Sequence, residues 1–189
     1  MEYILSIDAG TTAFKTSLFD EKGRLLGIFT YEYELLTPTS LAVELPAETF
    51  WNAFKSGIKN VLKKTKVNPS DIRSLGLSVQ GETLLMIDKK GDPLRNAIIW
   101  LDNRAQKEAE ILSKEFDVNR LSYKTTGQVK IVPTWPASKI FWVRNHEKNV
   151  FDKVYKYLLL EDYLIYKMTG EYVAEGSLLC STGAQSSSC

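Results

Sequence analysis

The sequence contains few of the residues that bind metals or form covalent cross-links: one histidine, two cysteines and three methionines among 189 residues. Cys180 and Cys189 have no metal-ligand spacing and no histidine partner, so the pattern predicts no zinc site. We expect two reduced thiols rather than a disulfide. His146 falls at the polar end of an expected helix, where a solvated side chain is a simpler interpretation than a general base.

An excess of charge of one sign is also absent. Lysine and arginine number 24 against 23 aspartates and glutamates, which gives a formal net charge of +1. This balance provides no field that would attract nucleic acid or an anionic membrane, so an anion has to be bound locally. Because no apolar run could span a bilayer and no charged-then-apolar leader is present, we expect a cytoplasmic protein without membrane or nucleic-acid partners.

The most informative segment of the chain runs from Tyr3 to Asp20. An apolar, strand-favouring run ends at Asp8, a Gly-Thr-Thr turn follows, and a second apolar run leads from Phe14 to Phe19. This pattern predicts a tight β-hairpin with polar groups at its tip.

The predicted hairpin tip carries groups that suit a polyphosphate. Gly10 allows close backbone approach and positive φ, so that N–H groups can point at an anion. Thr11 and Thr12 add hydroxyl donors, Lys15 adds a cation, and Asp8 can hold a hydrated Mg²⁺ beside phosphates. The tip is not a P-loop, because the G-x-x-x-x-G-K-[ST] spacing is absent and a strand follows the turn. An ordinary hairpin turn is the alternative, since Asp, Gly and Thr are common in turns.

Hydrophobic periodicity along the rest of the chain predicts an α/β protein, and the hydrophobic fraction of 44% is that of a globular chain. We expect a loop over Thr37 to Leu45 and a poorly ordered tail over Ser181 to Cys189. Further strands are expected at Arg24 to Tyr33, Ile72 to Val79, Leu84 to Ile87, Ile98 to Arg104 and Lys153 to Leu159, and helices over about 46–62, 105–116, 137–145 and 161–168, with a shorter one ending at Gly127. Strand, glycine-containing tip, strand and Asp-x-x-Gly turn occur at Asp8 to Gly23 and again around Gln80 to Gly91.

Trp100, Asp102 and Arg104 lie at alternate positions in Ile98 to Arg104. In a strand, period-two spacing places these three side chains on one face. Such a face suits a polyhydroxylated ligand, with the indole as a platform and the ionic groups as hydrogen-bonding partners. The alternative is a surface pair between Asp102 and Arg104 beside a core tryptophan.

Five motifs occur in one order and together resemble a known family. They are DAGTT at Asp8 to Thr12, SVQGET at Ser78 to Thr83, W-x-D-x-R at Trp100 to Arg104, TGQVKIVPTWPASKIFWV at Thr126 to Val143 and LLLEDYLIYKMTGE at Leu158 to Glu171. In this order they resemble the N-terminal domain of the FGGY carbohydrate kinases, the family of xylulokinase, glycerol kinase and gluconate kinase. The likeness implies an actin-like (RNase H-like) α/β domain with a mixed sheet and flanking helices.

The resemblance also implies a reaction and a set of site residues. Members transfer the γ-phosphoryl group of ATP to a sugar or polyol hydroxyl with Mg²⁺. By this likeness Asp8 lies near the metal and the transferring phosphate, with Gly10, Thr11, Thr12 and Lys15 along the β- and γ-phosphates. The implied sugar pocket contains Gln80, Gly81, Glu82, Trp100, Asp102, Arg104 and Thr134.

The chain departs from the family pattern at several of these positions. Lys15 stands where glycerol kinase has arginine, which keeps the charge and loses the bidentate fork, and Ala13 replaces a serine. Gly81 precedes Glu82 where glycerol kinase-like members carry arginine, and xylulokinases carry a Met-His pair at this tip. Thr134 takes the place of a tyrosine. These differences favour a pentulose, hexulose or longer polyol over glycerol.

The family's catalytic base and adenosine-binding loops lie beyond the length of this chain. We therefore expect residues 1–182 to be an N-terminal sugar-binding domain, 183–189 a disordered tail, and the nucleotide-binding domain to be missing, as in a truncated or frame-shifted product. Without a base, this half is expected to transfer phosphate poorly. A catalytically dead sugar-binding module, and a phosphatase or another sugar kinase superfamily on the same fold, are the alternatives. A homodimer of the full-length form is left open.

Overall fold

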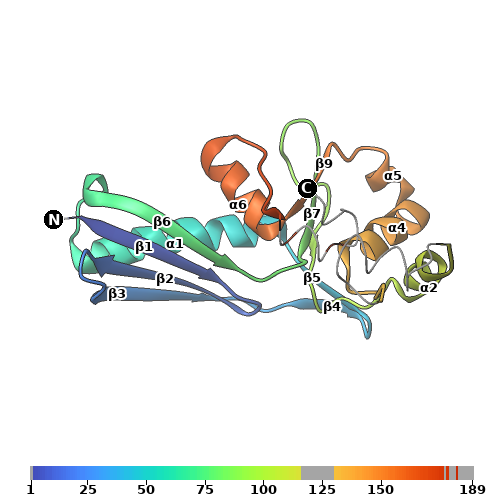
Figure 1. The fold of residues 1–189 in the computed structure, drawn as a ribbon, viewed down its shortest axis with the longest axis horizontal. Coiled ribbons are helices and arrows are strands. Elements are labelled where there is room, and N and C mark those ends of the chain that lie inside the picture. The colour runs from blue at the N-terminus through green and yellow to red at the C-terminus, as the bar shows by residue number, and fades with distance from the viewer. Residues whose placement is uncertain (1, 116–129, 177, 179–181, 183–189) are drawn as a thin grey trace. The chain divides into compact units, whose positions relative to one another are not determined.

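The computed structural model describes residues 2–115, 130–176, 178 and 182, which belong to two compact units. Unit 1 consists of Met1–Leu35 and Glu48–Gln80, and unit 2 of Leu36–Ala47 and Gly81–Cys189. Each unit is built on its own β-sheet (Figure 1). The short helix expected to end at Gly127, both cysteines and the predicted tail lie outside the described residues, apart from Thr182.

Unit 1 contains a four-stranded mixed sheet in the order β3-β2-β1-β6. The first three strands form the predicted meander, since β1 pairs antiparallel with β2 and β2 with β3. β6 pairs parallel with β1 and places a later segment beside the hairpin. The strands are β1 (Tyr3–Ala9), β2 (Ala13–Asp20), β3 (Leu25–Glu32) and β6 (Ile72–Val79).

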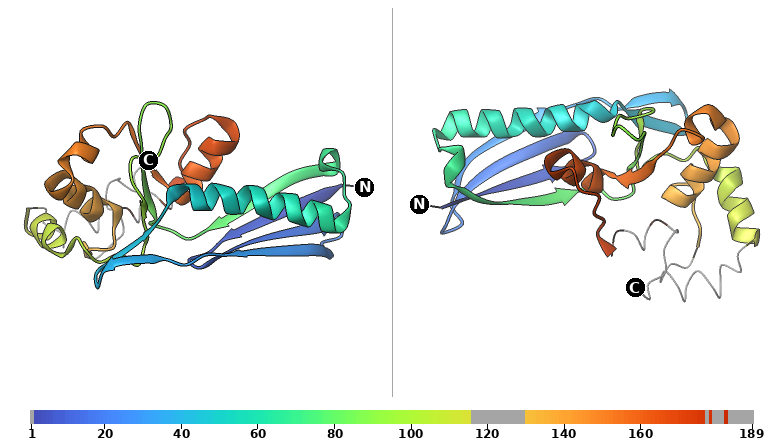
Figure 2. Two further views of the ribbon diagram at one scale, coloured as in Figure 1. Left: turned by 180° about the vertical axis from the view of Figure 1, so that it is seen from behind. Right: turned by 90° about the horizontal axis from the view of Figure 1, so that it is seen from above.

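Helix α1 (Ala47–Thr65) lies along one face of this sheet (Figure 2). The face is apolar because alternate residues of each strand point to it, and Leu5 and Leu18 are buried there with Val61 of the helix. Helix and sheet approach closely at one point, where a β-carbon on Gly57 would lie 2.0 Å from the Thr16 hydroxyl oxygen. The predicted amphipathic helix is confirmed, and the strand residues between the buried ones remain on the sheet face opposite the helix.

Unit 2 contains a five-stranded antiparallel sheet in the order β4-β5-β8-β7-β9. Two of its strands fall in the segment Thr37 to Leu45, so the predicted loop is wrong. The N–H groups of Ile99 and Asn103 donate to the carbonyls of Val43 and Leu41, so partners far along the chain complete this pairing. The strands are β4 (Leu36–Thr39), β5 (Ala42–Leu45), β7 (Leu84–Ile87), β8 (Ala97–Ile98) and β9 (Lys156–Leu159).

The described helices of unit 2 begin and end close to the predicted positions. They are α2 (Gln106–Glu115), α4 (Pro136–His146), α5 (Lys148–Phe151) and α6 (Leu160–Thr169), of which α5 was not predicted. Gly170 ends α6 in the left-handed conformation at φ 78°, as expected for a C-cap glycine. Val143 of α4 packs with Leu84, Met86 and Ile98 of the sheet. In the described part of the chain, no helix combines the length and the apolar character needed to cross a membrane.

The repeated layout seen in the sequence corresponds to the same turn in both units. In one turn the Asp20 carboxylate accepts two backbone N–H groups and Gly23 has φ 75°. In the other, Asp88 accepts two backbone N–H groups and Gly91 has φ 86°. Each Asp-x-x-Gly segment therefore needs aspartate to hold the backbone and glycine to adopt a positive φ.

Candidate functional site

The β1–β2 hairpin of unit 1 ends in a tight turn closed by Gly10. The Gly10 N–H donates to the carbonyl of Ala13 at 3.0 Å, and a β-carbon on Gly10 would lie 3.0 Å from the same oxygen. The positive-φ glycines in the described residues are Gly23, Gly91 and Gly170, so Gly10 is not among them. The predicted positive φ and ligand-facing N–H of Gly10 are therefore wrong. Glycine is needed there because the turn brings two backbone segments together.

The carbonyl of Gly10 is held from two directions. The Tyr33 hydroxyl donates to it at 2.5 Å and the Gln80 side-chain amide at 3.2 Å. Gln80 also donates its backbone N–H to Ala9, so it packs against the hairpin within unit 1, and its side-chain carbonyl oxygen is buried without a hydrogen bond in the described part of the structure. Burial, and then the charge of Asp8, raise the pKa of Tyr33 well above its ordinary value, so Tyr33 stays a neutral donor.

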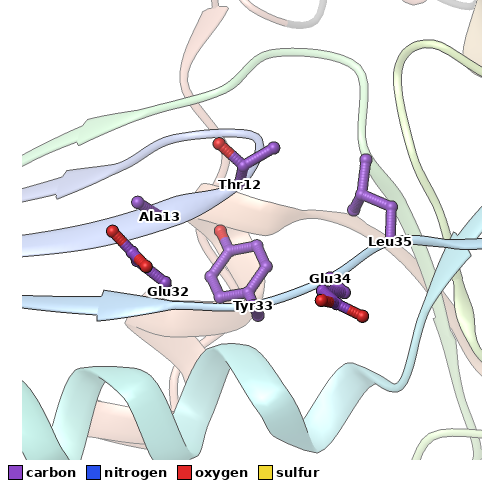
Figure 3. Close-up of a pocket in the computed structure, with 6 residues that line it drawn as sticks. All are labelled: Thr12, Ala13, Glu32, Tyr33, Glu34 and Leu35. Atoms are coloured by element: carbon purple, nitrogen blue, oxygen red, sulfur yellow. The ribbon is translucent and has the colours of Figure 1, made fainter.

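Tyr33 was missed by the sequence analysis, because a tyrosine just after a strand carries no local signal of its partner. Figure 3 shows its ring directed from the end of β3 toward the hairpin turn. The groove beside it has a volume of about 820 Å³ and is lined by Thr12, Ala13, Glu32, Tyr33, Glu34 and Leu35. Among the described residues, two carboxylates and no cation line this groove, so the described lining does not suit an anion.

Asp8 and Lys15 occupy the sheet face that α1 does not cover. They are direct partners across β1 and β2, and both are exposed. Ser78 of β6 lies beside Asp8 and Thr30 of β3 beside Lys15, which makes a polar row across the sheet. Within the described residues neither charge is in an ion pair of 4 Å or less. The Asp8 carboxylate and the Lys15 ammonium therefore lie on neighbouring strands without forming an ion pair with each other.

The donor set at this tip has one carboxylate, Asp8, and two hydroxyls, Thr11 and Thr12. No group of three or more histidine, cysteine, aspartate or glutamate side chains in the described residues could enclose a metal ion. Mg²⁺ is usually bound through one or two carboxylates, several waters and the phosphates of a substrate. The set at the tip fits a magnesium ion brought in with a polyphosphate and does not fit a permanent metal site.

The other predicted site residues lie in unit 2, where Glu82 has an unusual backbone. Its φ of 61° is left-handed, which is uncommon for a residue with a β-carbon. The hydroxyl of the next residue, Thr83, accepts the N–H of Trp100 at 3.3 Å. The Glu82–Thr83 segment is therefore joined to the turn that carries Trp100. Gly81 precedes it, and a β-carbon there would lie 3.3 Å from the Leu178 side chain.

The predicted strand from Ile98 to Arg104 ends at Ile98, so the period-two face is wrong. The chain turns after β8, with the N–H of Asp102 donating to the carbonyl of Ile99 at 3.0 Å. In this turn, which we call the Trp100 turn (Ile99–Asp102), Trp100 is 39% exposed while Asp102 is fully buried. The residues that follow a strand pattern in sequence thus point in different directions.

Asp102 and Arg104 belong to a buried charge network in unit 2. The Arg104 guanidinium donates to Asp102 at 2.8–3.0 Å and to Glu44 at 2.7 Å. Burial alone would lower the pKa of Arg104, but its hydrogen bonds to Asp102 and Glu44 outweigh burial and raise that pKa. Arg95 extends the network from Glu44 to Glu147. The predicted Asp102–Arg104 pair is confirmed, but it is buried rather than on the surface.

A second tryptophan, Trp142, lies beside this pair. The guanidinium carbon of Arg104 lies 4.9 Å from the Trp142 ring centroid, which is cation–π distance. The His146 ring stacks on the Trp142 ring, with the two ring centroids 4.8 Å apart. Its Nε2 lies 3.2 Å from the Glu108 carboxylate, and the His146 side chain is half exposed. Thr134 is partly buried in the turn before α4.

Lys139 of α4 is a further buried charge that the sequence analysis missed. Its Nζ donates to the carbonyls of Ile99 at 2.9 Å and Glu82 at 3.2 Å. Burial lowers its pKa to about 8, although the carboxylates of Asp102 and Glu82 act in the opposite direction. In the sequence the sign is a lysine whose neighbours three or four positions away, Trp135, Trp142 and Val143, are apolar.

Comparison with known proteins gives consistent matches. Residues 3–185 match the FGGY family of carbohydrate kinases, N-terminal domain. A xylulose kinase from Staphylococcus xylosus is 33% identical over 177 residues, and a glycerol kinase from Thermococcus gammatolerans is 33% identical over 181 residues. The matches cover 94% and 93% of this chain. Because the chain is equally identical in sequence to a xylulose kinase and to a glycerol kinase, overall sequence identity does not indicate which substrate it would bind.

A solved structure agrees with these sequence matches. The crystal structure of a xyloylose kinase from Brucella ovis matches 96% of this chain with a TM-score of 0.89 and 28% identity. The chain spans 37% of that structure and 36% of the length of each of the two curated relatives. The likeness therefore concerns about the first third of those proteins.

Proposed function

The chain belongs to the FGGY family of carbohydrate kinases, and from this premise we propose that it forms the sugar-binding part of an enzyme that phosphorylates a ketose or polyol with ATP. The α/β architecture with a mixed sheet and flanking helices is consistent with the actin-like ATPase fold of its structural relatives. Residues 1–182 are proposed as the family's N-terminal domain. The phosphoryl donor, the acceptor and the roles of individual residues are proposals for this chain.

The observation that carries the proposal is the exposed Asp8–Lys15 pair beside the threonines of the hairpin tip. Phosphoryl transfer needs little covalent help from a protein and much positioning and charge neutralisation. Lys15 would neutralise the oxygens of the β- and γ-phosphates as a point charge, and the hydroxyls of Thr11 and Thr12 would donate hydrogen bonds to them. Since the Gly10 N–H is used inside the turn, Gly10 contributes turn shape and not a donor.

Asp8 is proposed to hold Mg²⁺ through one carboxylate oxygen. When bound there with ATP, Mg²⁺ would supply neutralisation of the charge that develops during transfer. Tyr33 and Gln80 would keep the turn in place by holding the Gly10 carbonyl. Because Tyr33 stays neutral, its support of the turn does not change near neutral pH.

The acceptor side is proposed to consist of residues from unit 2. Glu82 would accept hydrogen bonds from sugar hydroxyls, and the exposed indole of Trp100 would provide an apolar platform. We assign Asp102 and Arg104 a supporting role, since Asp102 is fully buried and their bonds to each other, Val43 and Glu44 hold the Trp100 turn. Gly81 and Thr134 are smaller than the arginine and tyrosine implied by glycerol kinase, which favours a pentulose, a hexulose or a longer polyol over glycerol.

The acceptor hydroxyl must lose a proton as its oxygen attacks the γ-phosphorus and the bond to the ADP oxygen breaks. We propose that the base and the adenosine-binding residues come from sequence other than residues 1–189, and that these residues alone bind sugar but turn over very slowly. A catalytically inactive sugar-binding module is the second candidate, because Glu82 and the exposed Trp100 could bind a sugar without a phosphoryl donor.

Reading the coding DNA beyond the codon for Cys189 and assaying the complete product separates these candidates. The assay would follow ADP formation with D-xylulose, D-gluconate and glycerol, together with sugar binding by calorimetry. Turnover with any of the three supports the kinase proposal, and faster turnover with D-xylulose than with glycerol supports the preference for a ketose. Sugar binding without ATP turnover supports the binding module, and binding of neither sugar nor ATP contradicts both.

A further inference from the structure

The ammonium group of Lys139 lies between the two segments of unit 2 proposed for the acceptor. It donates to Glu82 in the Glu82–Thr83 segment and to Ile99 in the Trp100 turn. The residue is fully buried, whereas lysine is almost never fully buried unless it is paired. One side chain from α4 therefore connects the backbone of both segments.

The backbone that Lys139 holds is a strained one. Glu82 has a left-handed φ of 61°, and such a conformation persists only where its surroundings determine it. Lys139 fixes the Glu82 carbonyl, and Thr83 fixes the N–H of Trp100. The Trp100–Thr83 bond joins the two segments directly, and Lys139 joins them through its bonds to Glu82 and Ile99, so together they set the distance between Glu82 and Trp100.

The charged groups around the Lys139 ammonium are Glu82, Asp102 and Arg104. Burying a charge is costly, and an apolar side chain of similar volume would often serve stability as well. Asp102 and Arg104 already neutralise each other. What the buried ammonium provides, and an apolar side chain could not, is a pair of donors aimed at two backbone carbonyls.

We propose that Lys139 is a positioning residue of the acceptor site, which holds Glu82 and Trp100 in their working arrangement without touching sugar or nucleotide. The inference rests on the proposed function, because it takes Glu82 and Trp100 as acceptor-binding residues. Loss of the ammonium releases Glu82 from its left-handed conformation and weakens acceptor binding. The phosphate-side groups lie on the hairpin of unit 1 and keep their own hydrogen bonds.

The test is Lys139→Met in the complete gene product, with Asp162→Ala as the buried-charge control. Asp162 is also a buried charge of unit 2, but its carboxylate accepts the N–H of Leu159 at the start of α6 and is no part of the Glu44–Arg104–Asp102 network. Sugar Kd is measured by calorimetry with D-xylulose, D-gluconate and glycerol, and KM and kcat by ADP release. We expect Lys139→Met to raise sugar Kd and KM at least tenfold with kcat at saturating sugar within about threefold. Asp162→Ala lowers the unfolding temperature and leaves sugar Kd unchanged.

The outcomes separate this inference from the proposed function. If the unmodified protein binds none of the three probes, the proposed function fails before any variant is compared. If it binds one and folded Lys139→Met binds it equally well, the positioning role is overturned. Should Lys139→Met not fold, Lys139→Gln replaces it, since the amide nitrogen lies one bond closer to the backbone than Nζ and cannot hold both carbonyls at once. A folded Gln variant with unchanged sugar Kd overturns the inference in the same way.

Discussion

Arg104 donates three side-chain hydrogen bonds to the carboxylate of Asp102, at 2.8–3.0 Å. Asp102 is fully buried and also accepts the N–H of Val43 at 2.6 Å. The pair thus joins the segment after β8 to β5 inside unit 2. Both charges act first on the fold, and through the fold they present the exposed Trp100.

Arg104→Met is expected to lower the free energy of unfolding by about 3–5 kcal/mol, because it leaves Asp102 buried without its partner. Urea unfolding of the purified protein measures the loss. Lys148→Met is the control, since Lys148 forms an exposed pair with Asp152 that should contribute less than about 1 kcal/mol. Equal small losses in both variants would show that the buried pair does not stabilise unit 2.

Asp8→Ala is expected to reduce kcat of the complete enzyme at least a hundredfold and to leave sugar Kd unchanged. Asp8 is exposed and makes no ion pair within the described residues, so the unfolding free energy should change by less than about 0.5 kcal/mol. Steady-state kinetics and sugar calorimetry check both statements. A fall in sugar affinity as steep as the fall in turnover would contradict the phosphate-side placement.

Trp100→Ala should act in the opposite way and weaken sugar binding first. The indole is 39% exposed, and a lost stacking platform is expected to raise sugar Kd about tenfold. Trp51→Ala serves as the control, because Trp51 stacks on Phe54 in unit 1 with ring centroids 5.1 Å apart. An unchanged sugar Kd for Trp100→Ala would remove Trp100 from the acceptor site.

Lys139 predicts a pH dependence of stability whose sign follows from its lowered pKa. Burial lowers the pKa from the ordinary value of 10.5 to about 8, so below pH 8 the full cost of burying the ammonium is present. Between these values the unfolded chain binds a proton that the native protein does not, and stability rises with pH. Relative to Lys139→Met, the unmodified protein should gain up to about 3 kcal/mol from pH 8 to 10.5. A stability difference between the unmodified protein and Lys139→Met that does not change from pH 8 to 10.5 would contradict the lowered pKa of Lys139.

Gly57→Ala is expected to destabilise unit 1 by about 2–3 kcal/mol, because the added β-carbon would lie 2.0 Å from the Thr16 hydroxyl oxygen. Thr16→Ala alone should be nearly neutral, since that hydroxyl is buried without a hydrogen bond in the described structure. Combining the two substitutions should recover most of the loss. Denaturant unfolding of the four proteins measures the coupling, and additive effects would show that the two residues do not clash.

Local sequence was sufficient where one segment carries its own pattern. The β1–β2 hairpin, α1 and the left-handed Gly23 and Gly170 follow from alternation, helical spacing and turn chemistry within a few residues. The family also follows from the sequence, because the order of the five motifs can be recognised without knowing which residues are in contact.

Two errors fall where distant partners determine the backbone. The segment Thr37 to Leu45 forms strands because β8 pairs with it. The segment Ile98 to Arg104 does not continue as a strand, because the buried Asp102 carboxylate accepts hydrogen bonds from Arg104 and Val43. A period-two pattern says which residues alternate, but it does not say where a strand ends.

By itself the sequence determined the family, the hairpin and the chemical types of the site residues. Only the tertiary structure decided that Asp8 and Lys15 stand exposed side by side, that Asp102 is paired in the interior and that Lys139 holds Glu82. The physical reason is that propensity acts between near neighbours in the chain, whereas burying a charge requires partners that only the folded chain brings within hydrogen-bonding distance.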